Sequence, residues 1–263
     1  MRRTIAVCAL LIAGFTLGSA TAQTAVGMAT LRPAAAPAAR YLYQASSART
    51  ASLHCIDGLV GWWQGNGNAR DSACGHNGLL RGPVTFGPGV SGKAFSFSGA
   101  QTTVRVPQTP AFNVGAAVSL DFWFKGAPGN AMNTCCQGLV TTDFYGIELS
   151  AGRENSVGIN FFVSTDDGAS SQHTSDLAGG GYTLAPGKWI HVAGIYDGRR
   201  LRLYVNDRLV ATTPHTGAIS PMRSTSFLSI GSEDGRSYYP SLVGTRYFQG
   251  LIGAVKIYHR AIR

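Results

Sequence analysis

Short runs in which apolar and polar residues alternate recur along most of the chain, and they indicate strands rather than helices. The run "VSLDFWFK" places every second residue from Val118 to Phe124 on one face, and Asp121 and Trp123 on the other. Comparable runs, separated by Gly, Pro, Asn and Asp, are "LVGWWQ", "KAFSFSG", "TTVRVP", "YGIELS", "SVGINFFVS", "SFLSIGS" and "FQGLIGAVKIYHR". About ten to twelve such strands predict an all-β, two-sheet antiparallel jelly-roll β-sandwich.

The stretch "GKWIHVAGIYDGRRLRLYVNDRLVAT" is the clearest predicted hairpin. Its apolar face is expected in the core, with Tyr196 and Tyr204 on the opposite face. Asp197-Gly198 predicts a type I′ turn, in which both central residues need a positive φ. The residues expected to face the core are Ile190, Val192, Leu201, Leu203 and Val205.

The first 50 residues carry no strand pattern. A positive start, an apolar run from Ile5 to Leu17 and small residues up to Ala22 predict a signal peptide over residues 1–22. Residues 23–50 are rich in Ala and Pro and predict a disordered linker. One domain is predicted over residues 51–263, in a secreted or periplasmic protein. The apolar run is too short for a stable membrane span, and no later segment approaches one.

Charge gives no indication of a nucleic-acid partner. The formal net charge is +9, from 22 basic and 13 acidic residues. Five of the basic residues precede the predicted domain and all acids lie within it, which leaves a net charge of +4. The longest basic cluster, from Arg199 to Arg202, fits a solvated hairpin, whereas nucleic-acid binding needs a larger patch.

Four cysteines remain after the predicted signal peptide, and an even number in an exported chain predicts disulfides with three possible connectivities. Cys55 precedes the first predicted strand and Cys74 lies in the loop after it. We expect these two to be bonded, which would pin the chain entry to that loop. Cys135 and Cys136 would then form a strained vicinal pair or remain free thiols.

Five blocks in order resemble the laminin-G-like jelly rolls of the concanavalin A-like lectin and glucanase superfamily. They are "GLVGWWQGNGNARDSACGHNG", "GKAFSFSGAQTTVRVP", "VSLDFWFK", the hairpin stretch and "YFQGLIGAVKIYHRAI", which together span residues 55–262. The resemblance implies two curved antiparallel sheets with the first and last strands side by side. It implies no single activity, because the fold hosts lectin-like modules, adhesive modules and enzymes.

The sequence lacks the features that the family's enzymes need. Glucanases of this fold use paired carboxylates in a Glu-x-Asp-x-Glu arrangement on one strand, and no glutamate here has an acid two residues away. Asp143 and Glu148 are five residues apart, which places them on opposite faces of an unbroken strand. Polysaccharide lyases on related jelly rolls need a basic set of strands that carries His and Tyr. His191 and Tyr196 resemble one such strand only loosely, and the partner strands are missing. We therefore expect a protein that is not an enzyme.

Calcium is the family's commonest accessory, and the loop "GNGNARDSACGHNG" offers oxygen ligands from Asn66, Asn68, Asp71 and Asn77, of which Asp71 matches the family's loop aspartate. The closing strand normally adds acids in a sequence such as Ile-Asp-Glu-Val. This chain has Ile252-Gly253-Ala254-Val255 instead. We therefore expect no cofactor, or at most weak calcium binding.

Exposed aromatic and polar residues in a long loop are the predicted ligand contacts. The expected partner is a glycan or a surface protein, and the alternatives are a polysaccharide-degrading hydrolase or lyase, or a structural envelope protein. The predicted ligand-binding residues are Glu233, Asp234, Arg236, Tyr238 and Tyr239.

Overall fold

Two antiparallel sheets form the fold, as expected. The computed structural model describes residue 55 and residues 57–128, 137–151, 157–165, 170–175, 187–233 and 246–262. The predicted signal peptide and linker therefore lie outside the described residues. Sheet A contains, in spatial order, β13 (Arg208–Pro214), β12 (Arg200–Val205), β11 (Ile190–Tyr196), β6 (Val118–Gly126), β15 (Gln249–Tyr258), β4 (Lys93–Ser98) and β3 (Thr85–Pro88), with β1 (Leu59–Trp63) also on β15.

Sheet B forms the second layer of the sandwich. Its spatial order is β10 (Ser170–Ser175), β9 (Val157–Thr165), β8 (Tyr145–Ala151), β7 (Gln137–Thr141), β14 (Phe227–Ile230), β5 (Thr103–Pro107) and β2 (Leu79–Arg81). A single turn of 3-10 helix, η1 (Pro110–Phe112), precedes β6. The described part of the chain contains no helix long and apolar enough to cross a membrane.

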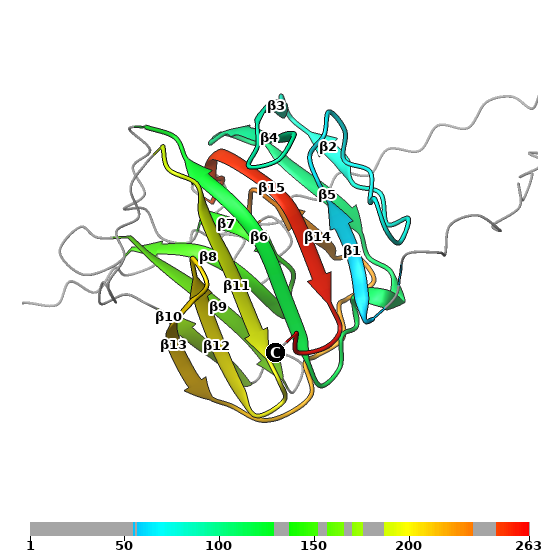
Figure 1. The fold of residues 1–263 in the computed structure, drawn as a ribbon. Helices are drawn as coiled ribbons and strands as arrows, with labels where there is room; N and C mark the ends of the chain where they lie inside the picture. The colour runs from blue at the N-terminus through cyan, green and yellow to red at the C-terminus, as the bar shows by residue number, and fades with distance from the viewer. Residues whose placement is uncertain are drawn as a thin grey trace, which may run out of the picture. The chain divides into compact units, whose positions relative to one another are not determined.

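The last described strand, β15, joins the two halves of sheet A. One edge pairs with β6 along most of its length, and the other pairs first with β4 and then with β1 (Figure 1). The first and last strands therefore lie side by side, as the family resemblance implied. The register shifts between Gly253 and Lys256, where Ala254 has a φ of 54°.

Alternation along β6 and β11 fills the core from one face of sheet A. The pairs Phe124 with Ile190 and Phe122 with Val192 face sheet B and are almost fully buried. Tyr196 belongs to the same face, so its predicted position opposite the core is wrong. Its side chain is fully buried, and its hydroxyl donates to the Gly217 carbonyl at 2.7 Å. This bond satisfies the one polar group that burial would otherwise leave unpaired.

The type I′ turn lies one hairpin later than predicted. Gly198 has a positive φ, but Asp197 does not, and the Asp197 carboxylate instead accepts the backbone N–H groups of Arg199 and Arg200. Asn206 and Asp207 have φ values of 47° and 64° and connect the paired residues that end β12 and begin β13. Asn and Asp tolerate this left-handed conformation better than other non-glycine residues.

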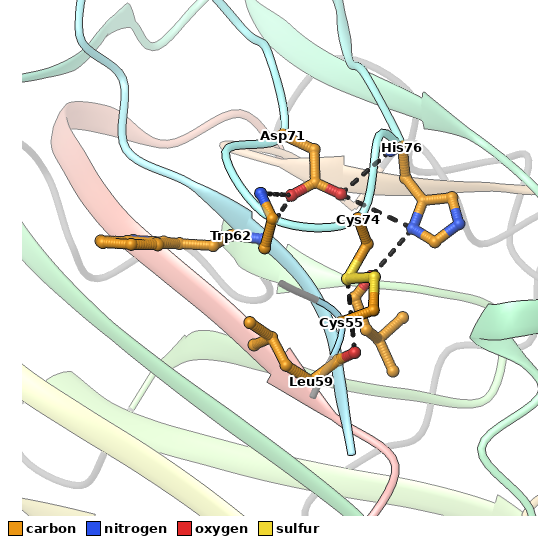
Figure 2. Close-up of a disulfide and its surroundings, with 8 residues drawn as sticks. Cys55, Leu59, Trp62, Asp71, Cys74 and His76 are labelled. Atoms are coloured by element: carbon orange, nitrogen blue, oxygen red, sulfur yellow. Dashed lines mark hydrogen bonds and ion pairs between the residues drawn. A yellow bond between two sulfur atoms is a disulfide. The ribbon is translucent and has the colours of Figure 1, made fainter. Parts of the chain in front are cut away.

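A disulfide joins Cys55 to Cys74, with the Cα atoms 5.2 Å apart, which is the pairing that we expected (Figure 2). It ties the segment before β1 to the loop that follows β1. The Cys74 sulfur also lies 3.4 Å from the Leu59 carbonyl oxygen. Cys135 and Cys136 lie outside the described residues.

Candidate functional site

Most of the predicted ligand-binding loop falls outside the described residues, namely Asp234, Arg236, Tyr238 and Tyr239. Glu233 is described, and it is buried rather than exposed. Its Oε2 atom lies 2.6 Å from Nη1 of Arg246, which is also buried. This ion pair joins the segment that ends at Glu233 to the segment that begins at Arg246.

Asp71, a predicted calcium ligand, organises the loop after β1 through hydrogen bonds (Figure 2). Its Oδ1 atom accepts the backbone N–H groups of Trp62 and Ala73, both at 2.9 Å. Its Oδ2 atom accepts the backbone N–H of His76, also at 2.9 Å. The side-chain Oδ1 of Asn77 accepts the backbone N–H of Asp71 at 3.0 Å. The carboxylate is fully buried and takes the role of an internal cap.

These residues do not fit a calcium ion. Calcium needs six to eight oxygen ligands directed at one point, whereas the oxygens of Asp71 and Asn77 are directed at backbone N–H groups. The closing strand contributes only Gly253 and Ala254 at the position where the family has acids. Within the described ranges, no group of three or more His, Cys, Asp or Glu residues could hold a metal ion.

The two carboxylates considered for catalysis take part in separate hydrogen bonds. Asp143 precedes β8 and accepts a hydrogen bond from the Ser226 hydroxyl. Glu148 lies within β8, is buried, and accepts the Asn160 amide N–H at 2.8 Å. These two partners, Ser226 and Asn160, are both neutral side chains.

A different group of polar residues gathers on the outer face of sheet A, where sequence reasoning had not placed a site. Alternation puts Asp121 and Trp123 of β6 on this face, together with His191 of β11. His191 lies directly opposite Trp123, and their rings stack with centroids 4.9 Å apart. Asp121 lies two residues along the strand, opposite Ala193, whose small side chain leaves room above the sheet.

His191 bridges two carboxylates. Its Nε2 atom is 3.1 Å from Oδ2 of Asp121, and its Nδ1 atom is 3.1 Å from Oδ1 of Asp207. Ionised carboxylates only accept hydrogen bonds, so the imidazolium, with both nitrogens protonated, satisfies both contacts. The hydrogen bond from His191 to Asp121 is the largest cause that raises the pKa of His191 above 6.5. Partial burial lowers this pKa, and the charge of Asp121 and then the hydrogen bond and charge of Asp207 raise it further.

The Asn206-Asp207 turn positions this bridge from outside the sheet. The side-chain oxygen of Asn206 accepts the backbone N–H of His191 at 3.0 Å, and the Asn206 backbone N–H donates to the His191 carbonyl at 2.9 Å. The turn is thereby fixed to β11. The Asp207 carboxylate can then lie beside the imidazole while remaining 88% exposed.

The bridge forms one side of a half-enclosed hollow of about 550 Å³, which is within the usual range of small-molecule sites. Ala193 and Ile195 provide an apolar floor, and Tyr204 adds an aromatic ring with a hydroxyl group. Such a hollow can receive the C–H face of a small polar molecule and accept hydrogen bonds from its hydroxyl groups. Its lining residues are Asp121, His191, Ala193, Ile195, Tyr204, Asp207 and Ile262.

Part of this site was visible in the sequence. The alternation of "VSLDFWFK" indicated that Asp121 and Trp123 leave the core, and the alternation of "WIHVAGIY" contained the same signal for His191. The register of β6 against β11 brings residues 70 positions apart into contact. No local pattern specifies that register.

Comparison with known proteins gives one family and a set of related folds. The sequence model of the family described as the concanavalin A-like lectin/glucanases superfamily matches residues 98–263. No curated protein shows significant sequence similarity to the chain. One similar structure is domain 4 of AbnA, a GH43 extracellular arabinanase from Geobacillus stearothermophilus, in complex with arabinotriose. The similarity has a TM-score of 0.56 at 17% identity, over 78% of this chain and 94% of that chain.

Two further similar structures are toxin binding domains. The binding domain of botulinum neurotoxin DC, in complex with SialylT, has a TM-score of 0.54 at 16% identity, over 79% of this chain and 49% of that chain. The binding domain of Paraclostridial Mosquitocidal Protein 1 has a TM-score of 0.50 at 13% identity, over 79% and 50%. The chain thus spans about half the length of these two toxin domains. At these identities the similarity shows the fold alone.

Proposed function

The chain belongs to the concanavalin A-like lectin/glucanase superfamily, and from this membership we propose that it is an exported, non-catalytic module that binds a glycan. The hollow on the outer face of sheet A is the binding site. The observation that carries the proposal is the composition of its lining, which combines an apolar floor, a tyrosine ring and two carboxylates bridged by His191.

This combination suits a sugar because a sugar ring is amphipathic. Its C–H groups pack on aromatic and small apolar side chains, and its hydroxyl groups donate to carboxylates. Ala193, Ile195 and Tyr204 supply the first kind of contact. Asp121 and Asp207 supply the second, and the bridge through His191 holds both carboxylates in place before a ligand arrives. Such preorganisation reduces the entropy lost on binding.

Related folds support a glycan as the ligand class. The arabinanase domain was solved with arabinotriose and the botulinum neurotoxin domain with SialylT, so two proteins with this fold contact saccharides. The proposed export rests on the predicted signal peptide over residues 1–22, and it agrees with the disulfide between Cys55 and Cys74.

A catalytic function is less well supported than a binding function. A retaining hydrolase needs a nucleophilic carboxylate and an acid about 5 Å apart. In the described residues the hollow contains two acids, but each accepts a hydrogen bond from His191 and neither is buried. Asp143 and Glu148 are engaged elsewhere.

The test is a glycan array probed with the purified domain, followed by isothermal titration of the best ligand. Tyr204→Ala and Asp121→Asn are expected to weaken binding about tenfold or more, the effect of losing a ring contact or a charge-assisted hydrogen bond. Phe227→Ala is the matched control, since Phe227 is a partly exposed strand aromatic on sheet B, beside Arg105. Binding that survives both hollow variants would show that the ligand site lies elsewhere.

A further inference from the structure

We propose that the hollow selects uncharged sugar residues and excludes acidic glycans, an inference that rests on the proposed function and adds the ligand class. Three observations carry it: the charges that line the hollow, the partners of the neighbouring cations, and the hydrogen-bonding groups that remain for a ligand.

The lining carries an excess of negative charge. Asp121 and Asp207 contribute two carboxylates, and the imidazolium of His191 offsets only one of them. Both imidazole N–H groups donate to these carboxylates at 3.1 Å, so His191 has no N–H left for an anionic ligand. The carboxylate or sulfate group of an acidic sugar would face two like charges, of which Asp121 is the less exposed and therefore the less screened by salt.

The cations on the same face are already engaged. Arg202 donates to Oδ2 of Asp197 at 2.7 Å. The Lys256 ammonium lies over the Trp62 ring and the Lys125 ammonium over the Trp189 ring, each 5.2 Å from the ring centroid. None of these cations is among the residues that line the hollow. Arg202 would have to leave Asp197 to reach an acidic glycan, whereas Lys256, the cross-strand neighbour of Asp121, keeps its charge over the Trp62 ring and lies outside the hollow.

The polar groups of the hollow that are open to a ligand are mainly hydrogen-bond acceptors. One oxygen of each carboxylate contacts His191, and the other, Oδ1 of Asp121 and Oδ2 of Asp207, accepts no hydrogen bond from the described part of the chain. Neutral sugars present hydroxyl donors on several sides of the ring, so separate hydroxyl groups can donate to the two carboxylates on either side of His191. Ala193, Ile195 and Ile262 give the ring an apolar surface without a charge.

The first experiment compares neutral and acidic ligands of one length on the wild-type domain. Arabinotriose, xylotriose and cellotriose are titrated beside trigalacturonate and a sialylated trisaccharide, by NMR chemical-shift mapping and calorimetry at low salt. We expect at least one neutral trisaccharide to shift the resonances of Tyr204 and Ala193 and to bind at least tenfold more tightly than either acidic one.

The second experiment changes one charge without changing the backbone. Asp207→Asn keeps an acceptor oxygen beside His191 and a residue type that tolerates a φ of 64°. We expect neutral ligands to bind several-fold more weakly to this variant. The ratio of the affinity for neutral trisaccharides to that for acidic ones should become smaller. Asp57→Asn is the matched control, because Asp57 also has a positive φ and is exposed but does not line the hollow. It is expected to leave both affinities unchanged.

The outcomes separate the two proposals. Acidic trisaccharides that bind more tightly, with shifts at Tyr204 and Ala193, overturn the selectivity and leave glycan binding in place. Unaltered discrimination in Asp207→Asn also overturns the selectivity. Absence of binding by every trisaccharide, together with a blank glycan array, overturns both proposals.

Discussion

Two carboxylates hold the His191 ring from opposite sides and favour its protonated form. The hydrogen bond and charge of Asp121 raise its pKa above 6.5 in the folded state, with a smaller contribution from Asp207. When the pKa of a group is higher in the folded protein than in the unfolded chain, its protonation stabilises the fold. This contribution is complete at pH values below the pKa in the unfolded chain and is lost as the pH rises through the pKa in the folded protein. The free energy of unfolding should therefore fall as pH increases from about 6.5 upward.

The measurement is urea unfolding of the wild type and of His191→Gln at several pH values from 5 to 9. The difference in unfolding free energy between the two proteins should be largest at pH 5 and shrink toward pH 9. Comparing the two proteins cancels the titration of the other histidines. A difference that stays constant with pH would show that His191 is not held as an imidazolium.

The Asp71 carboxylate stabilises the loop after β1 by accepting backbone N–H groups, and replacing it should lower the free energy of unfolding. In Asp71→Ala, the N–H groups of Trp62, Ala73 and His76 lose their acceptor. We expect the unfolding free energy to fall by about 3 kcal/mol, because unsatisfied polar groups cost about 1–3 kcal/mol each and water can satisfy part of them. Asp71→Asn, which keeps one carbonyl oxygen as an acceptor, should lose less.

Calcium should have little effect on the stability of the wild type. The oxygens of Asp71 and Asn77 are directed at backbone donors, and the closing strand has no acid beside them. At a concentration equal to a dissociation constant in the millimolar range, a ligand adds only about 0.4 kcal/mol. Melting temperatures in EDTA and in low-millimolar calcium should lie within about two degrees of each other. A large increase with calcium that Asp71→Ala abolishes would contradict this.

At the scale of elements, the disulfide fixes the start of β1. The two cysteines are 19 residues apart, and cross-linking a loop of this length stabilises the fold by about 3 kcal/mol on the chain-entropy account. The double variant Cys55→Ser/Cys74→Ser should lose about this amount in urea unfolding. Cys135→Ser/Cys136→Ser serves as the control for thiol loss. Non-reducing peptide mapping that linked Cys55 to Cys135 or Cys136 would contradict the pairing.

The turn between β12 and β13 depends on the residue type at position 206. Asn206→Val places a β-branched residue at a φ of 47° and removes the acceptor of the His191 backbone N–H. We expect a loss of about 2 kcal/mol, mostly from the strained backbone. Asn206→Asp keeps both the acceptor and the tolerance of positive φ and should cost much less. Equal stability of the two variants, measured by thermal unfolding, would mean that the turn has another conformation.

At the scale of the whole molecule, we expect no polysaccharide cleavage. The purified protein should release neither reducing ends nor unsaturated products from β-glucans, xylans, alginate or pectin. The physical reason is that Asp143 and Glu148, the two acids considered for catalysis, each accept a hydrogen bond from a neutral side chain, that of Ser226 and that of Asn160. Turnover that Asp143→Asn or Glu148→Gln abolished would show that one of these acids is catalytic after all.

The sequence predicted the strands and most of their faces because alternation is a local property. The faces of β6 follow from "VSLDFWFK" alone. The prediction for Tyr196 was wrong, although Tyr196 is four residues after Val192 and therefore lies on the same face of β11. Gly194 interrupts the apolar pattern between them, and the Gly217 carbonyl that pairs with the hydroxyl lies beyond the hairpin.

The site was less predictable because it depends on register and on a turn. Asp121 meets His191 only once β6 pairs with β11, and Asp207 reaches the imidazole only because the Asn206-Asp207 turn bends over it. The Asp-Gly pair at position 197 was a stronger turn signal in the sequence. In the structure, Asp197 instead caps the backbone of Arg199 and Arg200.

The position of β15 has a consequence for how the chain acquires its fold. Sheet A is assembled from two groups of strands, and β15, the last described strand to be synthesised, is the one that pairs with both. Until residues 249–258 are available, β4 and β6 each present an unpaired edge to solvent. Unpaired edges favour association with other chains. A nascent chain therefore cannot complete this sheet until β15 has been synthesised, and until then the strand edges that β15 covers stay open.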